Sequence, residues 1–101
     1  MEITRTLANG ANELKAGEAS MVTVSGPSAA YSITGIVGGR EARRLVIFNN
    51  TAYPLTLNHD DAASAASRRI RTSDGANKTA PAGGYALLAY NWGIQRWLLI
   101  V

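Results

Sequence analysis

Short runs of β-branched and aromatic residues recur along the chain, and turn signals separate them. Asn9-Gly10, Asp74-Gly75 and Gly83-Gly84 are dipeptides that supply the backbone conformations of tight turns. Helical periodicity is scarce, and 101 residues suffice for one domain. The pattern predicts an all-β, single-domain antiparallel β-sandwich or barrel of six to seven short strands. We expect strands at residues 3–7, 20–25, 31–37, 44–49, 55–58, 85–90 and 96–101.

The last two of these strands predict a C-terminal β-hairpin. Residues 91–95 join them, which is a connection of hairpin length with a glycine in it. Residues 97–101 are five consecutive apolar residues at the chain terminus. Such a strand would be prone to aggregation if it were exposed to water. We therefore expect the last strand to pair with residues 85–90 and to pack in the core or in a subunit interface.

Residues 45–48 and 97–101 are apolar at every position. A strand with one solvent-exposed face would instead alternate between apolar and polar residues. Both faces of these strands need a cover. One candidate is a subunit interface, and the other is the Ala-rich segment 60–71, which the sequence leaves open as helix or loop. We expect partner contacts from strand and turn residues, namely Phe48, Tyr53, Trp92, Trp97 and Leu99.

The charged residues do not indicate a nucleic-acid binder or a catalytic centre. Ten Lys and Arg against seven Asp and Glu give a net charge of +3, but the cations are interleaved with acidic residues. His59 is the single histidine and there is no cysteine. A zinc site needs three or four nitrogen or sulfur ligands, so His59 with Asp60 and Asp61 is too small a set. We expect a structural histidine, no metal, no cofactor and no enzymatic activity.

The first fourteen residues lack the basic start and apolar stretch of a signal peptide, and no apolar run is long enough for a membrane span. The sequence therefore predicts a protein that is made and kept soluble, without a membrane partner.

From Gly35 onward, the order of features resembles a small β-domain of tailed-bacteriophage virion proteins, found in tail fibres and head-decoration subunits. The matching pieces are Gly38-Gly39-Arg40, residues 44–50, residues 55–59, residues 64–70, the Gly83-Gly84 turn, residues 85–90 and Gln95-Arg96-Trp97. The resemblance implies an all-β, usually trimeric, non-enzymatic structural protein. Residues 35–101 would be the phage-like core, and residues 1–34 would add N-terminal strands or an arm.

The resemblance leads to two functional hypotheses. The first is a capsid decoration (cement) protein that stabilises the shell as a homotrimer. It would be located in the virion after assembly in the host cytoplasm, and it would bind the major capsid protein or other virion subunits. The alternative is a receptor-binding or tail-fibre tip module, in which Tyr53 and Trp92 contact a surface glycan. A nucleic-acid-binding barrel is a third hypothesis, favoured only by the basic net charge.

Overall fold

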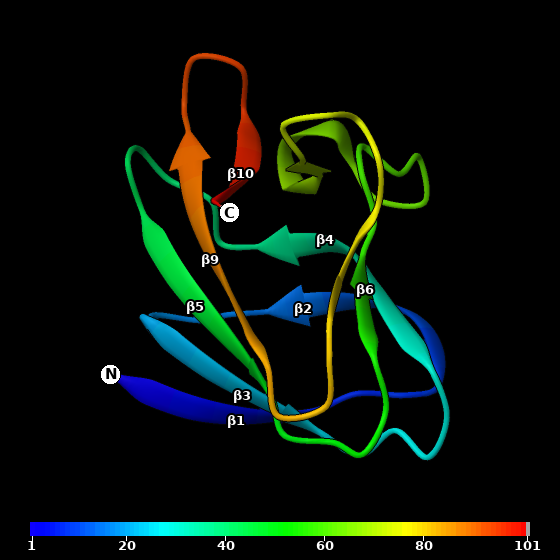
Figure 1. Cartoon of the computed structure of the whole chain (residues 1–101). Coiled ribbons are helices and arrows are strands. Elements are labelled where there is room, and N and C mark those ends of the chain that lie inside the picture. The colour runs from blue at the N-terminus through cyan, green and yellow to red at the C-terminus, as the bar shows by residue number, and fades with distance from the viewer. Residues whose placement is uncertain (101) are drawn as a thin grey trace.

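The computed structural model describes residues 1–100 as two β-sheets with ten strands, shown in Figure 1. The strands are β1 Glu2–Thr6, β2 Gly10–Lys15, β3 Met21–Ser25, β4 Tyr31–Val37, β5 Arg44–Asn49, β6 Leu55–Leu57, β7 Ile70–Arg71, β8 Lys78–Ala80, β9 Tyr85–Asn91 and β10 Arg96–Ile100. The all-β sandwich prediction is confirmed, but ten strands are present instead of six to seven. Within the described part of the chain, no helix is long and apolar enough to cross a membrane.

The chain moves back and forth between the sheets. The large sheet has the order β1-β3-β5-β9-β10-β7 and the small sheet has the order β2-β4-β6-β8, so β1 to β6 alternate between them. β1 to β4 each pair with the next strand but one, and five of the eight strand pairs are parallel. The expected antiparallel arrangement is therefore wrong for most pairs. A parallel pair needs a long crossover, and a strand of the opposite sheet supplies it here.

Three strands are missing from the prediction. β2 contains Asn, Glu and Lys, which are poor strand formers, and it buries only Leu14. β7 and β8 have two and three residues, too few to show an alternating pattern. The segment 60–71, left open between helix and loop, forms a 3₁₀ turn at Ala66–Arg68 followed by β7. Residues 1–34 place strands in both sheets.

The C-terminal β-hairpin is present as expected. β9 and β10 pair antiparallel, with Trp97 opposite Tyr90, and β7 lies on the other side of β10. β10 is therefore an interior strand of the large sheet, as the run of apolar residues predicts. Val101, the last residue of the expected strand, lies outside the described residues.

Trp97 is the largest fully buried side chain of the core between the two sheets. Its indole Nε1 donates a hydrogen bond to the carbonyl of Ile36 in the small sheet, at 3.1 Å. Its ring meets Tyr90 edge to face, with ring centroids 5.2 Å apart. The side chain thus joins the sheets through both apolar packing and a satisfied polar group.

Arg43 is a buried cation beside this tryptophan. Its guanidinium lies 5.9 Å from the ring centroid of Trp97 and donates to the carbonyls of Gly38, at 2.8 Å, and Ala19, at 2.6 Å. Burial lowers the pKa of Arg43 below its ordinary value. Gly38 has a φ of +114°, and a Cβ there would lie 2.6 Å from Nη1 of Arg43, so the close approach needs glycine.

Asn49, at the end of β5, is a fully buried polar residue that links both sheets. Its Nδ2 donates to the carbonyls of Tyr53, Ala80 and Pro81, at 2.8, 3.1 and 3.1 Å. Its Oδ1 accepts hydrogen bonds from the hydroxyls of Tyr31, on β4, and of Thr51. One side chain therefore satisfies polar groups from β4, β8 and two connecting segments.

We expect Trp97→Ala to lower the free energy of unfolding by about 3 to 5 kcal/mol, as truncation of a core tryptophan does. Trp92→Ala is the matched control: this side chain is 54% exposed, and its loss should cost no more than about 1 kcal/mol. Urea denaturation of both variants measures the difference. Equal losses would contradict the placement of Trp97 in the core.

We expect Asn49→Leu to cost at least about 3 kcal/mol, because several buried groups lose their hydrogen-bond partner at about 1 to 3 kcal/mol each. The neighbouring Asn50 is exposed, so Asn50→Leu should change stability by less than about 0.5 kcal/mol. Chemical denaturation of the two variants tests this, and a mild effect at Asn49 would show that its hydrogen bonds are dispensable.

Candidate functional site

One face of the large sheet points away from the small sheet and has no cover within the described residues. Buried positions alternate with outward positions along β3, β5, β9 and β10. The strand register places the outward side chains in rows across the sheet. The middle row consists of Glu2, Met21, Val46, Leu87 and Ile100.

The two flanking rows extend this apolar surface. One row contains Thr4, Thr23, Phe48 and Tyr85, and the other contains Arg44, Ala89, Leu98 and Arg71. We call the apolar members the outer apolar face; they are Met21, Val46, Phe48, Tyr85, Leu87, Ala89, Leu98 and Ile100. No charged side chain interrupts these eight residues, which come from four adjacent strands.

Several of these side chains are well exposed, and the face is hollowed. Tyr85 is 74% exposed and Ile100 is 48% exposed. An open depression of about 350 Å³ is lined by Met21, Val46, Phe48, Tyr85 and Leu87. Large exposed apolar patches of this kind mark interaction surfaces in soluble proteins.

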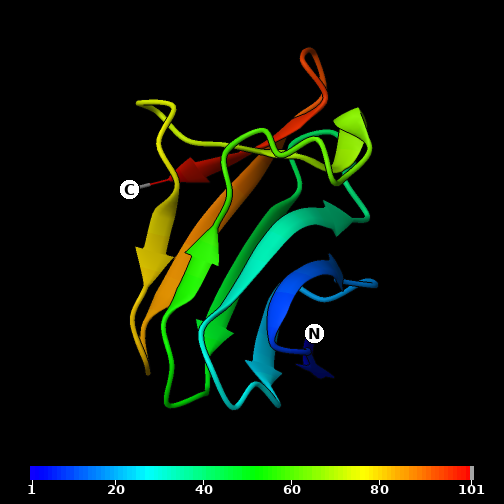
Figure 2. The same cartoon turned by 90° about the vertical axis from the view of Figure 1, so that its right-hand side faces the viewer.

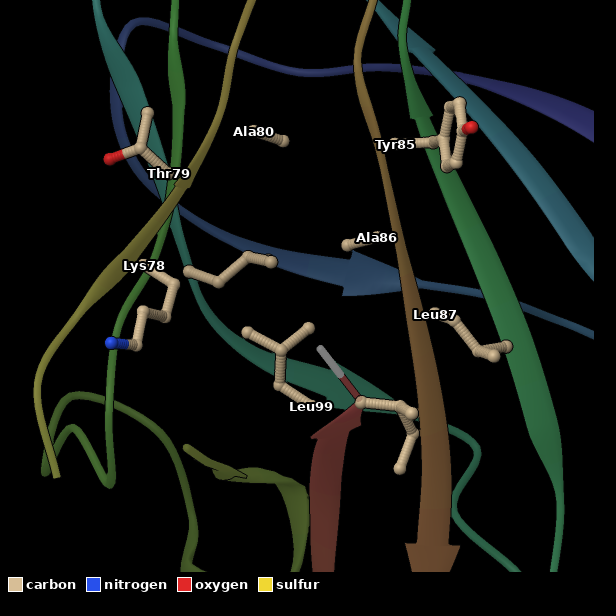
Figure 3. Close-up of a pocket in the computed structure, with 9 residues that line it drawn as sticks. Lys78, Thr79, Ala80, Tyr85, Ala86, Leu87 and Leu99 are labelled. Atoms are coloured by element: carbon tan, nitrogen blue, oxygen red, sulfur yellow. The ribbon is translucent and has the colours of Figure 1, made fainter. Parts of the chain in front are cut away.

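A second depression, of about 250 Å³, lies between the two sheets next to the outer apolar face. Figure 3 shows Tyr85 and Leu87 on one side of β9 and Ala86 on the other, with Leu99 from β10 and Lys78, Thr79 and Ala80 from β8 nearby. Tyr85, Leu87 and Ile100 line this depression and also belong to the outer apolar face. The apolar surface therefore continues around the sheet toward β8.

Charged residues lie at the margins of the outer apolar face. Within residues 1–100, Glu2, Arg44 and Arg71 form none of the ion pairs. Arg96, by contrast, donates through Nε to Asp60 Oδ1 at 2.9 Å. This hydrogen bond, with the charges of nearby arginines, holds the pKa of Asp60 below its ordinary value. Two arginines and one glutamate at the margin are thus available to a partner.

A polar depression of about 300 Å³ lies elsewhere, at the β9–β10 turn. Its lining comes from three segments: Gly38 and Gly39 after β4, Ser67 and Arg68 of the 3₁₀ turn, and Tyr90, Trp92 and Gln95 of the hairpin. We call it the hairpin pocket.

The structure separates the five residues expected to make partner contacts. Phe48 lies on the outer apolar face. Trp97 and Leu99 are buried in the core, because alternate residues of β10 face the small sheet; of the two alternatives, core or interface, the core is the one observed. Tyr53 lies in the turn before β6, and Trp92 lines the hairpin pocket.

Most of the outer apolar face was not predicted residue by residue. Met21, Tyr85, Leu87 and Ile100 carry no motif of their own. The available signal was that residues 45–48 and 97–101 are apolar at every position, so that one side of each strand stays uncovered after the core is filled. That signal indicates a second apolar face without telling which residues form it.

His59 has a structural role at the end of β6. The ring Nδ1 of His59 accepts a hydrogen bond from the backbone N–H of Thr72 at 3.0 Å. The backbone N–H of His59 donates to Asn77 Oδ1 at 2.7 Å. Within residues 1–100, no group of three or more His, Cys, Asp or Glu side chains is arranged to hold a metal ion.

Comparisons with protein-family models, with curated proteins and with solved structures find no match to this chain.

We expect the Asp60–Arg96 interaction to add stability that depends on pH. A carboxyl whose pKa is lowered by folding stabilises the protein above its unfolded pKa of about 3.9, and the contribution is lost as the pH falls toward the folded value. Asp60→Asn, which suits the φ of 44° at this position, should therefore cost up to about 1 kcal/mol at pH 7 and progressively less as the pH is lowered below about 3.9. Urea denaturation across this range checks it, and a cost independent of pH would contradict it.

Proposed function

We propose that this protein is a non-enzymatic structural subunit of a bacteriophage virion, a capsid decoration (cement) protein that assembles as a homotrimer through its outer apolar face. The observation that carries the proposal is this face, with eight uncharged apolar residues across four strands. The order of sequence features from Gly35 onward, which resembles that of phage decoration and fibre domains, supports the assignment to virion structural proteins.

The charges at the margins favour a second copy of the chain as the occupant of the face. Glu2 lies on β1 and Arg71 on β7, which are opposite edges of the large sheet. If the copies turn their outer apolar faces toward a common axis, the β1 margin of one face lies beside the β7 margin of the next in a head-to-tail arrangement, so that opposite charges meet. Head-to-tail interfaces close into rings when the rotation permits, and a trimer is such a ring.

The proposed mechanism is passive. Each square ångström of apolar surface removed from water contributes about 25 cal/mol, so a subunit that covers apolar surface can strengthen a shell without chemistry. The marginal arginines and glutamate would set the orientation of neighbouring subunits more than their affinity. The virion partner in this proposal is the major capsid protein or another shell subunit.

The alternative, a receptor-binding or tail-fibre tip module, is favoured by a different observation. Trp92 projects at the hairpin turn beside a polar pocket, away from the outer apolar face. This site lies outside the outer apolar face and is therefore compatible with a trimer.

Light scattering coupled to size-exclusion chromatography tests the assembly. We expect the wild-type protein at micromolar concentration to have three times the mass of one chain, and Leu87→Asp to be monomeric, because burying a carboxylate in the apolar interface is unfavourable. Ala11→Asp, at an exposed position on the edge strand β2 of the small sheet, is the control and should stay trimeric.

A monomeric wild-type protein, or a trimer that survives Leu87→Asp, would overturn the role of the outer apolar face. Circular dichroism shows whether Leu87→Asp keeps its sheet structure, and if it does not, Tyr85→Lys, at the most exposed position of the face, replaces it. Cosedimentation with capsids of the phage that carries the gene then tests decoration, which requires the trimer to pellet with the shell.

A further inference from the structure

The β9–β10 turn projects beyond the rest of the sandwich (Figures 1 and 2). This turn carries an exposed tryptophan, Trp92. Trp92 is 54% exposed, and its ring centroid lies 6.4 Å from that of Tyr90, with a tilt of 52° between the rings. Tyr90 itself is buried and donates its hydroxyl hydrogen to the carbonyl of Ser67 at 2.7 Å. Trp92 is therefore held next to a rigid neighbour while one side of it stays open to solvent.

In the lining of the hairpin pocket, the Tyr90 ring packs directly against the backbone of Gly39. A Cβ at Gly39 would lie only 2.1 Å from the Tyr90 ring, so any side chain there would displace the ring. The pocket is also mainly polar, with Ser67, Arg68 and Gln95 in its lining. A concave site with an aromatic wall and a few polar groups is typical of small-ligand sites.

Gln95 occupies a backbone conformation that favours glycine. Its φ is 54°, in the left-handed region, whereas Gly93, two residues earlier in the same turn, has no positive φ. A glutamine in this conformation is strained relative to glycine, and such strain is commonly retained at functional positions. The amide of Gln95 lines the pocket, where it can both donate and accept hydrogen bonds.

The charge of the pocket is compensated. The Arg68 guanidinium lies 3.2 Å from Glu13 Oε1, so the one cation of the lining already has an anionic partner. A phosphate or carboxylate ligand would have to compete with Glu13 for this arginine. A neutral ring with several hydroxyl groups has no such requirement.

We propose that the hairpin pocket binds a neutral carbohydrate ring. The apolar C–H face of the sugar packs on Trp92, while its hydroxyl groups exchange hydrogen bonds with the Gln95 amide and the Arg68 guanidinium. The site lies apart from the outer apolar face, so sugar binding does not depend on the proposed trimer.

A glycan array probed with the labelled wild-type protein, followed by NMR titration of the strongest glycan, tests the proposal. We expect at least one neutral glycan to bind, and Trp92→Ala to weaken its binding by about tenfold or more, the scale of one lost aromatic stacking contact. Gln95→Gly should also weaken binding, yet raise the urea midpoint because it relieves the strained backbone.

Tyr53→Ala is the matched control, since Tyr53 is an exposed aromatic turn residue outside the pocket, and it should bind the glycan as the wild type does. Adenosine monophosphate serves as the charged aromatic probe. The proposal is overturned if no glycan on the array binds, if binding survives Trp92→Ala, or if the nucleotide binds at these residues while neutral glycans do not. Light scattering of Trp92→Ala should show the same mass as the wild type, which keeps this test separate from that of the outer apolar face.

Discussion

The buried side chain of Asn49 is the interaction on which the two-sheet arrangement most depends. The chain crosses between the sheets many times, and each crossing leaves backbone groups that need partners. Asn49 meets this need where β5 ends: it contacts β4 and β8 of the small sheet and the turn that leads into β6. Apolar packing alone would leave those carbonyls unpaired, and a low-dielectric interior makes an unpaired carbonyl costly.

Two surfaces with different chemistry result from this frame. The outer apolar face is built from regular strands, so its shape is rigid and suits extended contact with another protein surface. The hairpin pocket is built from turns, and its groups are polar and closely spaced around one exposed ring. Rigid strands support both of them, because Leu87 and Trp92 belong to, or directly follow, the same strand β9.

The sequence predicts the fold class, much of its strand content and the pairing of the C-terminal hairpin, but neither the other pairings nor the site. Residues 31–37 and 44–49 match β4 and β5, because their β-branched and aromatic content has no other interpretation. Parallel pairing was missed because it depends on contacts between strands that are distant in the sequence, and no local signal encodes them. The same holds for the outer apolar face: apolar residues on both sides of a strand reveal a second face, but the assignment of Leu87 outward and Leu88 inward requires the sheet itself.

The alternation of strands between sheets also affects how the chain acquires its structure during synthesis. Each of the strands β1 to β6 pairs only with strands that are not adjacent to it in the sequence. None of them therefore forms a hairpin with its immediate successor. Within residues 1–100, the one pairing between consecutive strands is that of β9 with β10, the two strands that follow all the others in the sequence. β9 also pairs with β5. The growing chain therefore lacks both the local β9–β10 pairing and the central β5–β9 pairing until these C-terminal strands have emerged. Emergence of β9 and β10 thereby becomes the event that lets the large sheet close.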